Sequence, residues 1–224
     1  PVNMYNFRST PDDKEKLILS VSRFEISGSK KQVEMIETFS EMCRLHPEDT
    51  RGWKLMLVGG STPGNTYMAD VEAAVAKSHG EIEFKTNAAV SEIREFYRRA
   101  AVFWHACGLD ESRPERVEHF GMTTVEAMQN CCVPIVIDGG GQREIVEHGG
   151  CGFRFSTLTE LMTFTLGVMN DRAQCRRMAE RAYQRSQLFG HAVFRDQLEQ
   201  LLEEVELQLL GHDVLPRTVA QAVA

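Results

Sequence analysis

Short apolar runs alternate with longer amphipathic stretches along most of this 224-residue chain. The apolar runs are rich in branched side chains, which is typical of buried strands, and lie at residues 17–21, 53–58, 82–84, 101–104, 133–137 and 153–155. Between them apolar residues recur at helical spacing, over 33–43, 67–76, 90–97 and 123–129. Strands that alternate with helices of this length favour a parallel sheet covered by helices on both faces. The predicted fold class is therefore α/β, a Rossmann-like doubly wound sheet.

The chain outside this alternation divides into three parts. Residues 1–16 are polar and are predicted to be a linker or entry arm, while 17–210 form one domain. Helical stripes continue after residue 157, and the last of them consists of Phe194, Leu198, Leu201, Leu202 and Val205. Residues 211–224 have little pattern and are predicted to be a fraying tail. Because the sequence opens on Pro1 without a Met, we expect it to be a fragment of a longer chain.

Charge and cysteine content narrow the class of protein. The formal net charge of -7 argues against a general nucleic-acid binder. No apolar run is long enough to span a bilayer. The six cysteines lack C-x-x-C spacing, so we predict reduced thiols in a cytoplasmic protein, with Cys131 and Cys132 buried at a turn. No group of residues has metal-ligand spacing.

Residues 118–152 carry the densest set of candidate functional groups. Glu118 and Glu126 lie eight positions apart around a Phe-Gly turn, ahead of a helix that Thr123 or Thr124 could cap. A strand, three glycines at 139–141 and a short helix over 144–147 follow. In such a sheet these loops lie at the carboxyl ends of the strands, where ligands bind.

Each carboxylate has a possible role and an ordinary alternative. Glu126 can accept both hydroxyls of a ribose, although a lone glutamate on a helix is more often only solvated. Glu118 can accept sugar hydroxyls or act as a base. The backbone N–H groups of Gly121, Met122 and Thr123 begin a helix and offer an anion site.

Basic residues follow the first strand. Arg23 ends that strand and Lys30 begins the first helix, so both lie at the rim where ligands bind. An arginine fork and a lysine point charge suit a diphosphate, and Lys31 could replace Lys30 in this role. His105 and His119 lie near the same edge, where a structural hydrogen bond is the commoner role.

Several common enzyme motifs are missing from the sequence. It has no G-x-G-x-x-G after the first strand, no G-x-x-x-x-G-K-[ST] and no G-x-S-x-G. These absences argue against nicotinamide-dependent, P-loop and α/β-hydrolase chemistry. There is also no D-x-D of the kind that a metal-dependent sugar transferase uses.

The strings E-H-F-G-M-T-T-V-E-A-M and P-I-V-I-D-G-G-G-Q-R-E-I-V-E-H-G resemble the C-terminal half of retaining GT-B glycosyltransferases of family four, also called group 1. The E-x7-E motif of that family falls on Glu118 and Glu126, and its basic pair on Arg23 and Lys30. Its Gly-Gly loop falls on Gly59 and Gly60.

This resemblance implies a donor-binding domain for a nucleotide-diphosphate sugar, which is a substrate, with no cofactor and no metal. Arg23 and Lys30 would neutralise the leaving diphosphate, and Glu118 would contact the donor sugar. Glu126 would hold the ribose, with Gly121, Met122, Thr123, Lys85, Thr86 and His105 as further donor-binding residues.

The resemblance also implies partners. The acceptor would be a hydroxyl of unknown identity, for which a glycan and a lipid-linked sugar are both open, and an N-terminal domain of the same enzyme would carry most acceptor contacts. We expect the present chain to be inactive alone, and peripheral membrane contact, if any, to come through that domain. Two alternatives stay open: a sugar-nucleotide epimerase of similar fold, and a non-catalytic nucleotide-sugar-binding domain.

Overall fold

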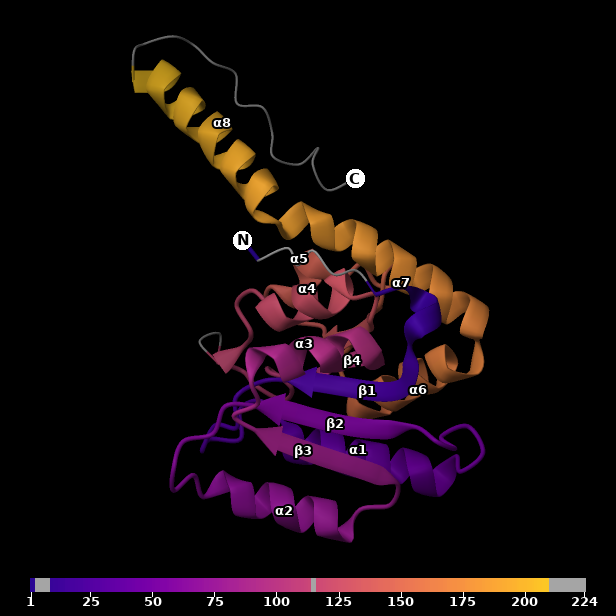
Figure 1. Ribbon diagram of the computed structural model, residues 1–224. Helices are drawn as coiled ribbons and strands as arrows, with labels where there is room; N and C mark the ends of the chain where they lie inside the picture. The colour runs from indigo at the N-terminus through magenta and orange to yellow at the C-terminus, as the bar shows by residue number, and fades with distance from the viewer. Residues whose placement is uncertain (3–8, 114–115, 210–224) are drawn as a thin grey trace.

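The computed structural model describes residues 1–2, 9–113 and 116–209, and its centre is a six-stranded parallel sheet (Figure 1). The strands are β1 Glu15–Val21, β2 Lys54–Gly59, β3 Glu81–Thr86, β4 Ala100–His105, β5 Val133–Ile137 and β6 Phe153–Phe155. Their order is β3-β2-β1-β4-β5-β6, and every neighbouring pair is parallel. The order reverses between β1 and β4, which places a crevice outside the carboxyl ends of these two strands. The predicted fold class is confirmed.

Helices cover both faces of the sheet (Figure 1). They are α1 Gln32–Leu45, α2 Tyr67–Lys77, α3 Val90–Arg99, α4 Met122–Gln129, α5 Gln142–Ile145, α6 Leu158–Asn170, α7 Arg172–Ser186 and α8 His191–Leu209. The prediction of a short helix over 144–147 was wrong by two residues. The Gly141 carbonyl already accepts from the amide of Glu144, so the helix begins earlier, and Val146 is extended.

Alternate residues of the central strands pack against different helices. Trp104 of β4 lies against Phe39 of α1, with ring centroids 6.4 Å apart. Its neighbour Phe103 faces the other side and lies 6.1 Å from the ring of Tyr97 in α3. The indole nitrogen of Trp104 donates to the Thr165 hydroxyl of α6 at 3.0 Å, so its polar atom is satisfied although the side chain is fully buried.

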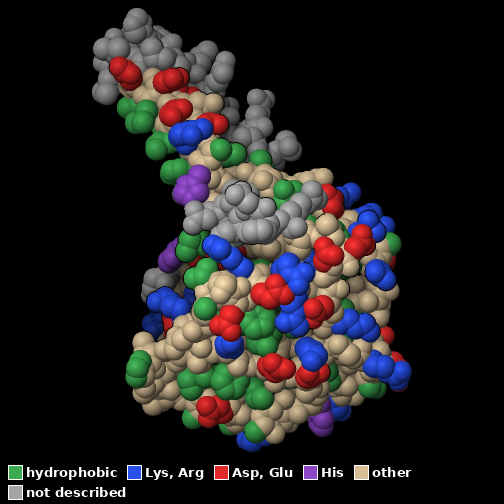
Figure 2. Space-filling model, in the orientation of Figure 1, with side chains coloured by type: hydrophobic (Ala, Val, Ile, Leu, Met, Phe, Trp, Pro, Cys, Tyr) green, Lys and Arg blue, Asp and Glu red, His purple; other side chains and the backbone are tan. Residues whose placement is uncertain are grey.

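Helix α8 projects away from the rest of the molecule (Figure 1). The sequence predicted its helical stripe, and the helix is confirmed. Its apolar side chains nevertheless stay 42–59% exposed, at Phe194, Leu198, Leu201, Leu202 and Val205. In Figure 2 green hydrophobic side chains lie along the projecting helix, with red acidic ones beside them. No described helix has the length and apolarity that crossing a bilayer requires. Residues 211–224, the predicted tail, lie outside the described residues.

The six cysteines, all within the described residues, are present as thiols. Cys131 and Cys132 are fully buried where α4 turns into β5. The adjacent pair is therefore part of the core, as the sequence predicted.

The three glycines after β5 let two loops touch backbone to backbone. The amide of Gly141 donates to the Glu118 carbonyl at 3.0 Å. Gly140 has a φ of +52°, and a Cβ atom there would lie 2.1 Å from the Glu118 carbonyl oxygen. The glycine-rich loop thus supports the segment that carries Glu118.

We expect Gly140→Ala to destabilise the fold by several kcal/mol, because it combines a left-handed backbone with a backbone clash. Gly149→Ala is the matched control, since Gly149 has a φ of +75° but nothing within 4 Å of the added Cβ. That control should lose only about 1–2 kcal/mol. Urea unfolding of both variants measures the difference, and equal losses would contradict the close approach of the two loops.

Candidate functional site

A polar cavity of about 420 Å³ lies outside the carboxyl ends of β1 and β4. It is lined by side chains that follow these strands, namely Arg23, Glu25, Ser27, Ser29, Lys30, Cys107, Arg116, Val117, Glu118 and His119. The cavity is at the reversal of strand order, where ligands bind in doubly wound sheets.

Lys30 lies in the turn between β1 and α1. The sequence placed it at the start of the helix, but α1 begins at Gln32, after a left-handed residue at position 31. The side-chain Nε2 atom of Gln32 donates at 3.0 Å to both the Ser22 hydroxyl and the Arg23 carbonyl. The helix start is thus tied to the end of β1, which fixes the turn that presents Lys30.

Glu118 is the centre of the site. Its Oε2 atom accepts from the Lys30 ammonium at 3.1 Å and lies 3.4 Å from the Nε2 atom of His105. The hydrogen bond with His105 is the largest cause that lowers the pKa of Glu118 to about 2; burial opposes it, and the Lys30 charge adds to it. Glu118 is therefore a stable anion at neutral pH.

The two partners of Glu118 are both largely removed from water. His105 ends β4 and is only 3% exposed, and its Nδ1 atom has no hydrogen-bond partner among the described residues. Burial lowers the pKa of Lys30, but the Cys107 sulfur and Glu118 outweigh it, so that the pKa lies above its usual value. Both the anion and the cation are therefore maintained inside the cavity.

Arg23 lies at the mouth of the same cavity. Its side chain is 76% exposed, and its guanidinium forms an ion pair with Glu25 at 2.8 Å. An exposed pair of this kind contributes little to stability, so Arg23 can turn towards an anionic ligand at low cost.

The start of α4 differs from the prediction that Thr123 or Thr124 caps it. Gly121 is the N-cap, with a φ of +112°, and no side chain caps the helix. This φ is one that residues with a side chain rarely adopt, and a Cβ atom at Gly121 would also lie 2.6 Å from the Nε2 atom of Gln142, so glycine is favoured there. Thr124 is buried instead, and its hydroxyl has no partner among the described residues.

The remaining predicted residues lie outside the lining of the cavity. Glu126 is in the second turn of α4, where its Oε2 atom accepts from the Tyr97 hydroxyl at 2.9 Å. Lys85 and Thr86 end β3, and Lys85 forms an ion pair with Glu92. The structure thus brings together Arg23, Lys30, Glu118 and His105. Gly121, Met122, Thr123, Glu126, Lys85 and Thr86 are not part of that cluster.

Cys107 and Arg116 are two of the six residues of the cavity that the sequence did not single out; the others are Glu25, Ser27, Ser29 and Val117. Cys107 lies two positions after His105, and its sulfur is 3.4 Å from the Lys30 ammonium. Burial raises the pKa of this thiol, so it is uncharged at neutral pH. Arg116 is two positions before Glu118 and pairs with Glu111 at 3.6 Å. In the sequence, Cys107 could have been found from its position just after a strand end, and Arg116 from its position close to the candidate carboxylate Glu118.

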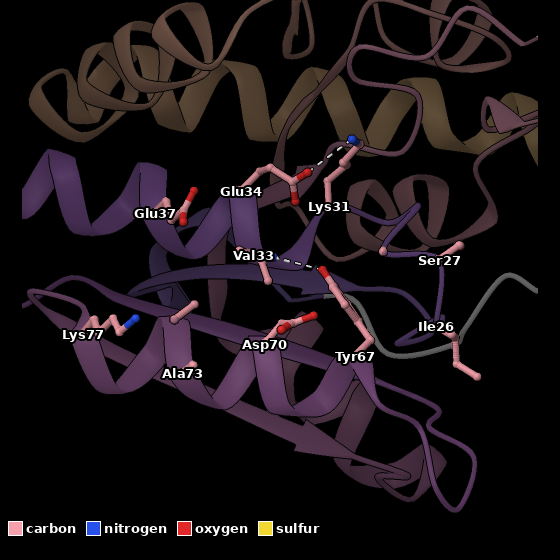
Figure 3. A pocket seen from close by; sticks show the side chains of 12 residues that line it. Ile26, Ser27, Lys31, Val33, Glu34, Glu37, Tyr67, Asp70, Ala73 and Lys77 are labelled. Carbon is pink, nitrogen blue, oxygen red and sulfur yellow. Dashed lines mark hydrogen bonds and ion pairs between the residues drawn. The ribbon is translucent and has the colours of Figure 1, made fainter.

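A second cavity, of about 530 Å³, lies between α1 and α2 (Figure 3). Lys31 is at this cavity and pairs with Glu34 at 3.2 Å. Glu34, Glu37, Asp70 and Lys77 also line it, so three carboxylates face two lysines and the walls do not favour a diphosphate. The structure therefore separates Lys31 from Lys30, which share neither cavity nor partner. The described residues contain no group of three or more His, Cys, Asp or Glu side chains that could hold a metal ion.

Comparison with known proteins links the chain to one family. Residues 3–185 match the sequence model described as Glycosyl transferases group 1. Similar structures include Anabaena HepE in complex with UDP and glucose, with a TM-score of 0.72 and 20% identity over 90% of this chain and 55% of that one. Sucrose-phosphate synthase from Thermosynechococcus elongatus has a TM-score of 0.67 and 21% identity, over 92% of this chain and 51% of the synthase. No curated protein matches the chain.

One further similar structure is a C-terminal domain that the match covers completely. The C-terminal domain of LpcC, a glycosyl transferase group 1 family protein from Francisella tularensis, matches with a TM-score of 0.64 and 18% identity, over 85% of this chain and 100% of that domain. The present chain spans about half the length of HepE and of the synthase. At these identities the likeness shows a common fold, which is the C-terminal half of the GT-B fold.

The lowered pKa of Glu118 predicts a pH dependence of stability. A carboxyl group with a depressed pKa stabilises the fold fully above about pH 4.5, and this contribution is lost as the pH falls towards 2. The wild type should therefore lose about 1–3 kcal/mol more than Glu118→Gln over this window.

Urea unfolding at pH 7, 4.5 and 3 measures this difference. Glu48→Gln is the control, because Glu48 is exposed and only pairs with Arg51 at the surface. A parallel loss of stability in the wild type and Glu118→Gln below pH 4.5 would contradict a stabilising role of the ionised Glu118 carboxylate.

Proposed function

The chain belongs to the Glycosyl transferases group 1 family, and from this premise we propose that it is the donor-binding domain of a retaining, metal-independent glycosyltransferase of family four. The enzyme would move a hexosyl group from a nucleotide-diphosphate sugar to an acceptor hydroxyl. The observation that carries the proposal is the contact of Lys30 and His105 with Glu118 inside a polar cavity.

Lys30 and Arg23 suit the diphosphate end of the donor. Charge builds up on the diphosphate as its bond to the sugar breaks, and fixed cations stabilise that charge. The Lys30 ammonium has three donors, so it can bind a phosphate oxygen while it keeps its contact with Glu118. Arg23 would supply a second cation from the mouth of the cavity.

Glu118 suits the sugar end. A general base works best with a pKa near the operating pH, whereas the pKa of Glu118 is about 2. We therefore assign it to accepting hydrogen bonds from sugar hydroxyls, with His105 acting on the donor through its contact with this carboxylate. The match to the glycosyltransferase family model favours a transferase over the epimerase.

The rest of the donor would extend towards neighbouring elements. Backbone amides of Gly121, Met122 and Thr123 at the start of α4 would donate to the diphosphate. Glu126 would accept the ribose hydroxyls. Lys85 and Thr86, at the end of β3, would frame the base.

The acceptor side belongs to the proposed second half of the enzyme. The match covers only 55% of HepE and 51% of the synthase, and HepE is also known in complex with UDP-glucose. We propose that an N-terminal domain binds the acceptor, a glycan or lipid-linked sugar, on the cytoplasmic side. The chain alone would then bind the donor without turnover, and turnover after addition of that half would separate it from a non-catalytic nucleotide-sugar domain.

We expect a nucleoside diphosphate to stabilise the chain without Mg²⁺ or Mn²⁺. The gain should reach about 2.7 kcal/mol at a ligand concentration one hundred times the dissociation constant. Thermal unfolding with UDP, GDP and ADP, each with and without a chelator, measures it.

The corresponding nucleosides are the control and should stabilise far less, because they lack the charge that Lys30 and Arg23 would bind. No shift with any diphosphate would contradict donor binding. A shift that disappears with the chelator would contradict metal independence.

A further inference from the structure

A hydrogen bond connects α3 to α4 beside the site. The hydroxyl of Tyr97 donates to the Oε2 atom of Glu126 at 2.9 Å. The two residues lie 29 positions apart in the chain. The sequence placed Tyr97 only in the apolar stripe of its helix, so this polar contact was not predicted.

Tyr97 is a rigid donor. Its side chain is 1% exposed and packs beside Phe103 of β4. Its backbone carbonyl accepts from the Lys14 ammonium at 3.1 Å and from the Cys132 thiol at 3.3 Å. Ring and backbone are thus both held by the core, and the hydroxyl is presented in one direction.

Glu126 has the opposite character. It is only partly buried and reaches from the second turn of α4 through a long side chain. A carboxylate that accepts two adjacent hydroxyls has to hold one orientation, and ordering a glutamate costs conformational entropy. Because the Tyr97 hydroxyl already holds one carboxylate oxygen of Glu126, this entropy is lost during folding and not when the ligand binds.

We propose that Tyr97 is a positioning residue, which orients the Glu126 carboxylate for the ribose of the donor nucleotide. This inference rests on the proposed ribose contact of Glu126. Tyr97 itself does not touch the ligand. Its loss should therefore weaken recognition of the ribose hydroxyls and spare the diphosphate contacts of Lys30 and Arg23.

The test is Tyr97→Phe, which removes one hydroxyl and keeps the packed ring. Calorimetry measures the affinity for the tightest-binding of UDP, GDP and ADP and for its 2′-deoxy form. The ratio of the affinity for the nucleotide to the affinity for its 2′-deoxy form should be roughly three- to tenfold lower in the variant than in the wild type. Glu126→Gln should reduce the ratio at least as much, and adding Tyr97→Phe to it should change the ratio little further.

Tyr67→Phe is the matched control. The Tyr67 hydroxyl accepts from the Val33 amide at 3.2 Å and is also largely buried, but it lies in α2, at the other cavity. This variant should lose thermal stability without any change in the ratio.

The outcomes distinguish the positioning role of Tyr97 from the ribose contact of Glu126. If the wild type and Glu126→Gln differ in the ratio but Tyr97→Phe matches the wild type, the positioning role of Tyr97 is overturned while the ribose contact stands. If the wild type binds both nucleotides equally, the ribose contact is overturned and the role of Tyr97 with it.

Discussion

The contact of Lys30 and His105 with Glu118 is the interaction on which the candidate site depends. It joins the turn after β1, the end of β4 and the loop before α4, three segments far apart in the chain. Taking a carboxylate partly out of water is costly unless cations and donors replace the water. Here a cation and a ring nitrogen do so, and the pKa of Glu118 falls accordingly. The site is thus organised before any ligand binds, which is the condition for electrostatic stabilisation of a leaving group.

The fold supports this arrangement through backbone contacts more than through side chains. Gly140 and Gly141 lie directly against the carbonyls of residues 118–120. These contacts fix the position of Glu118 relative to the ends of the strands. Gly59 makes a similar approach to Ser22, just ahead of Arg23, where a Cβ atom would be 1.8 Å from the carbonyl oxygen. Gly59, Gly140 and Gly141 therefore allow segments of backbone to pack together, and the polar side chains that these segments carry converge as a result. These three glycines support the site without needing to touch a ligand.

Much of the fold could be predicted from local patterns, and the limits of that prediction have physical causes. Periodicity identified all six strands because each is a short apolar run between helical stripes. Glu118 and Lys30 were each placed at the ligand edge, but the 88 positions between them hide their contact from any local pattern. The predicted cap at Thr123 or Thr124 was wrong because the helix already begins after Gly121, whose left-handed backbone glycine adopts without strain. Periodicity also gave the helix α8 but not the exposure of Phe194 and its neighbours, since exposure depends on what a helix packs against.

The proposed role of Lys30 in binding the diphosphate of the donor can be measured by the ratio of affinities for a nucleoside diphosphate and its nucleoside, in the wild type, Lys30→Met and Lys31→Met. The two lysines are adjacent but belong to different cavities, so each controls for the other. Lys30→Met should reduce the ratio by about tenfold or more, whereas Lys31→Met should leave it unchanged. An unchanged ratio in Lys30→Met, or a greater loss in Lys31→Met, would contradict this role of Lys30.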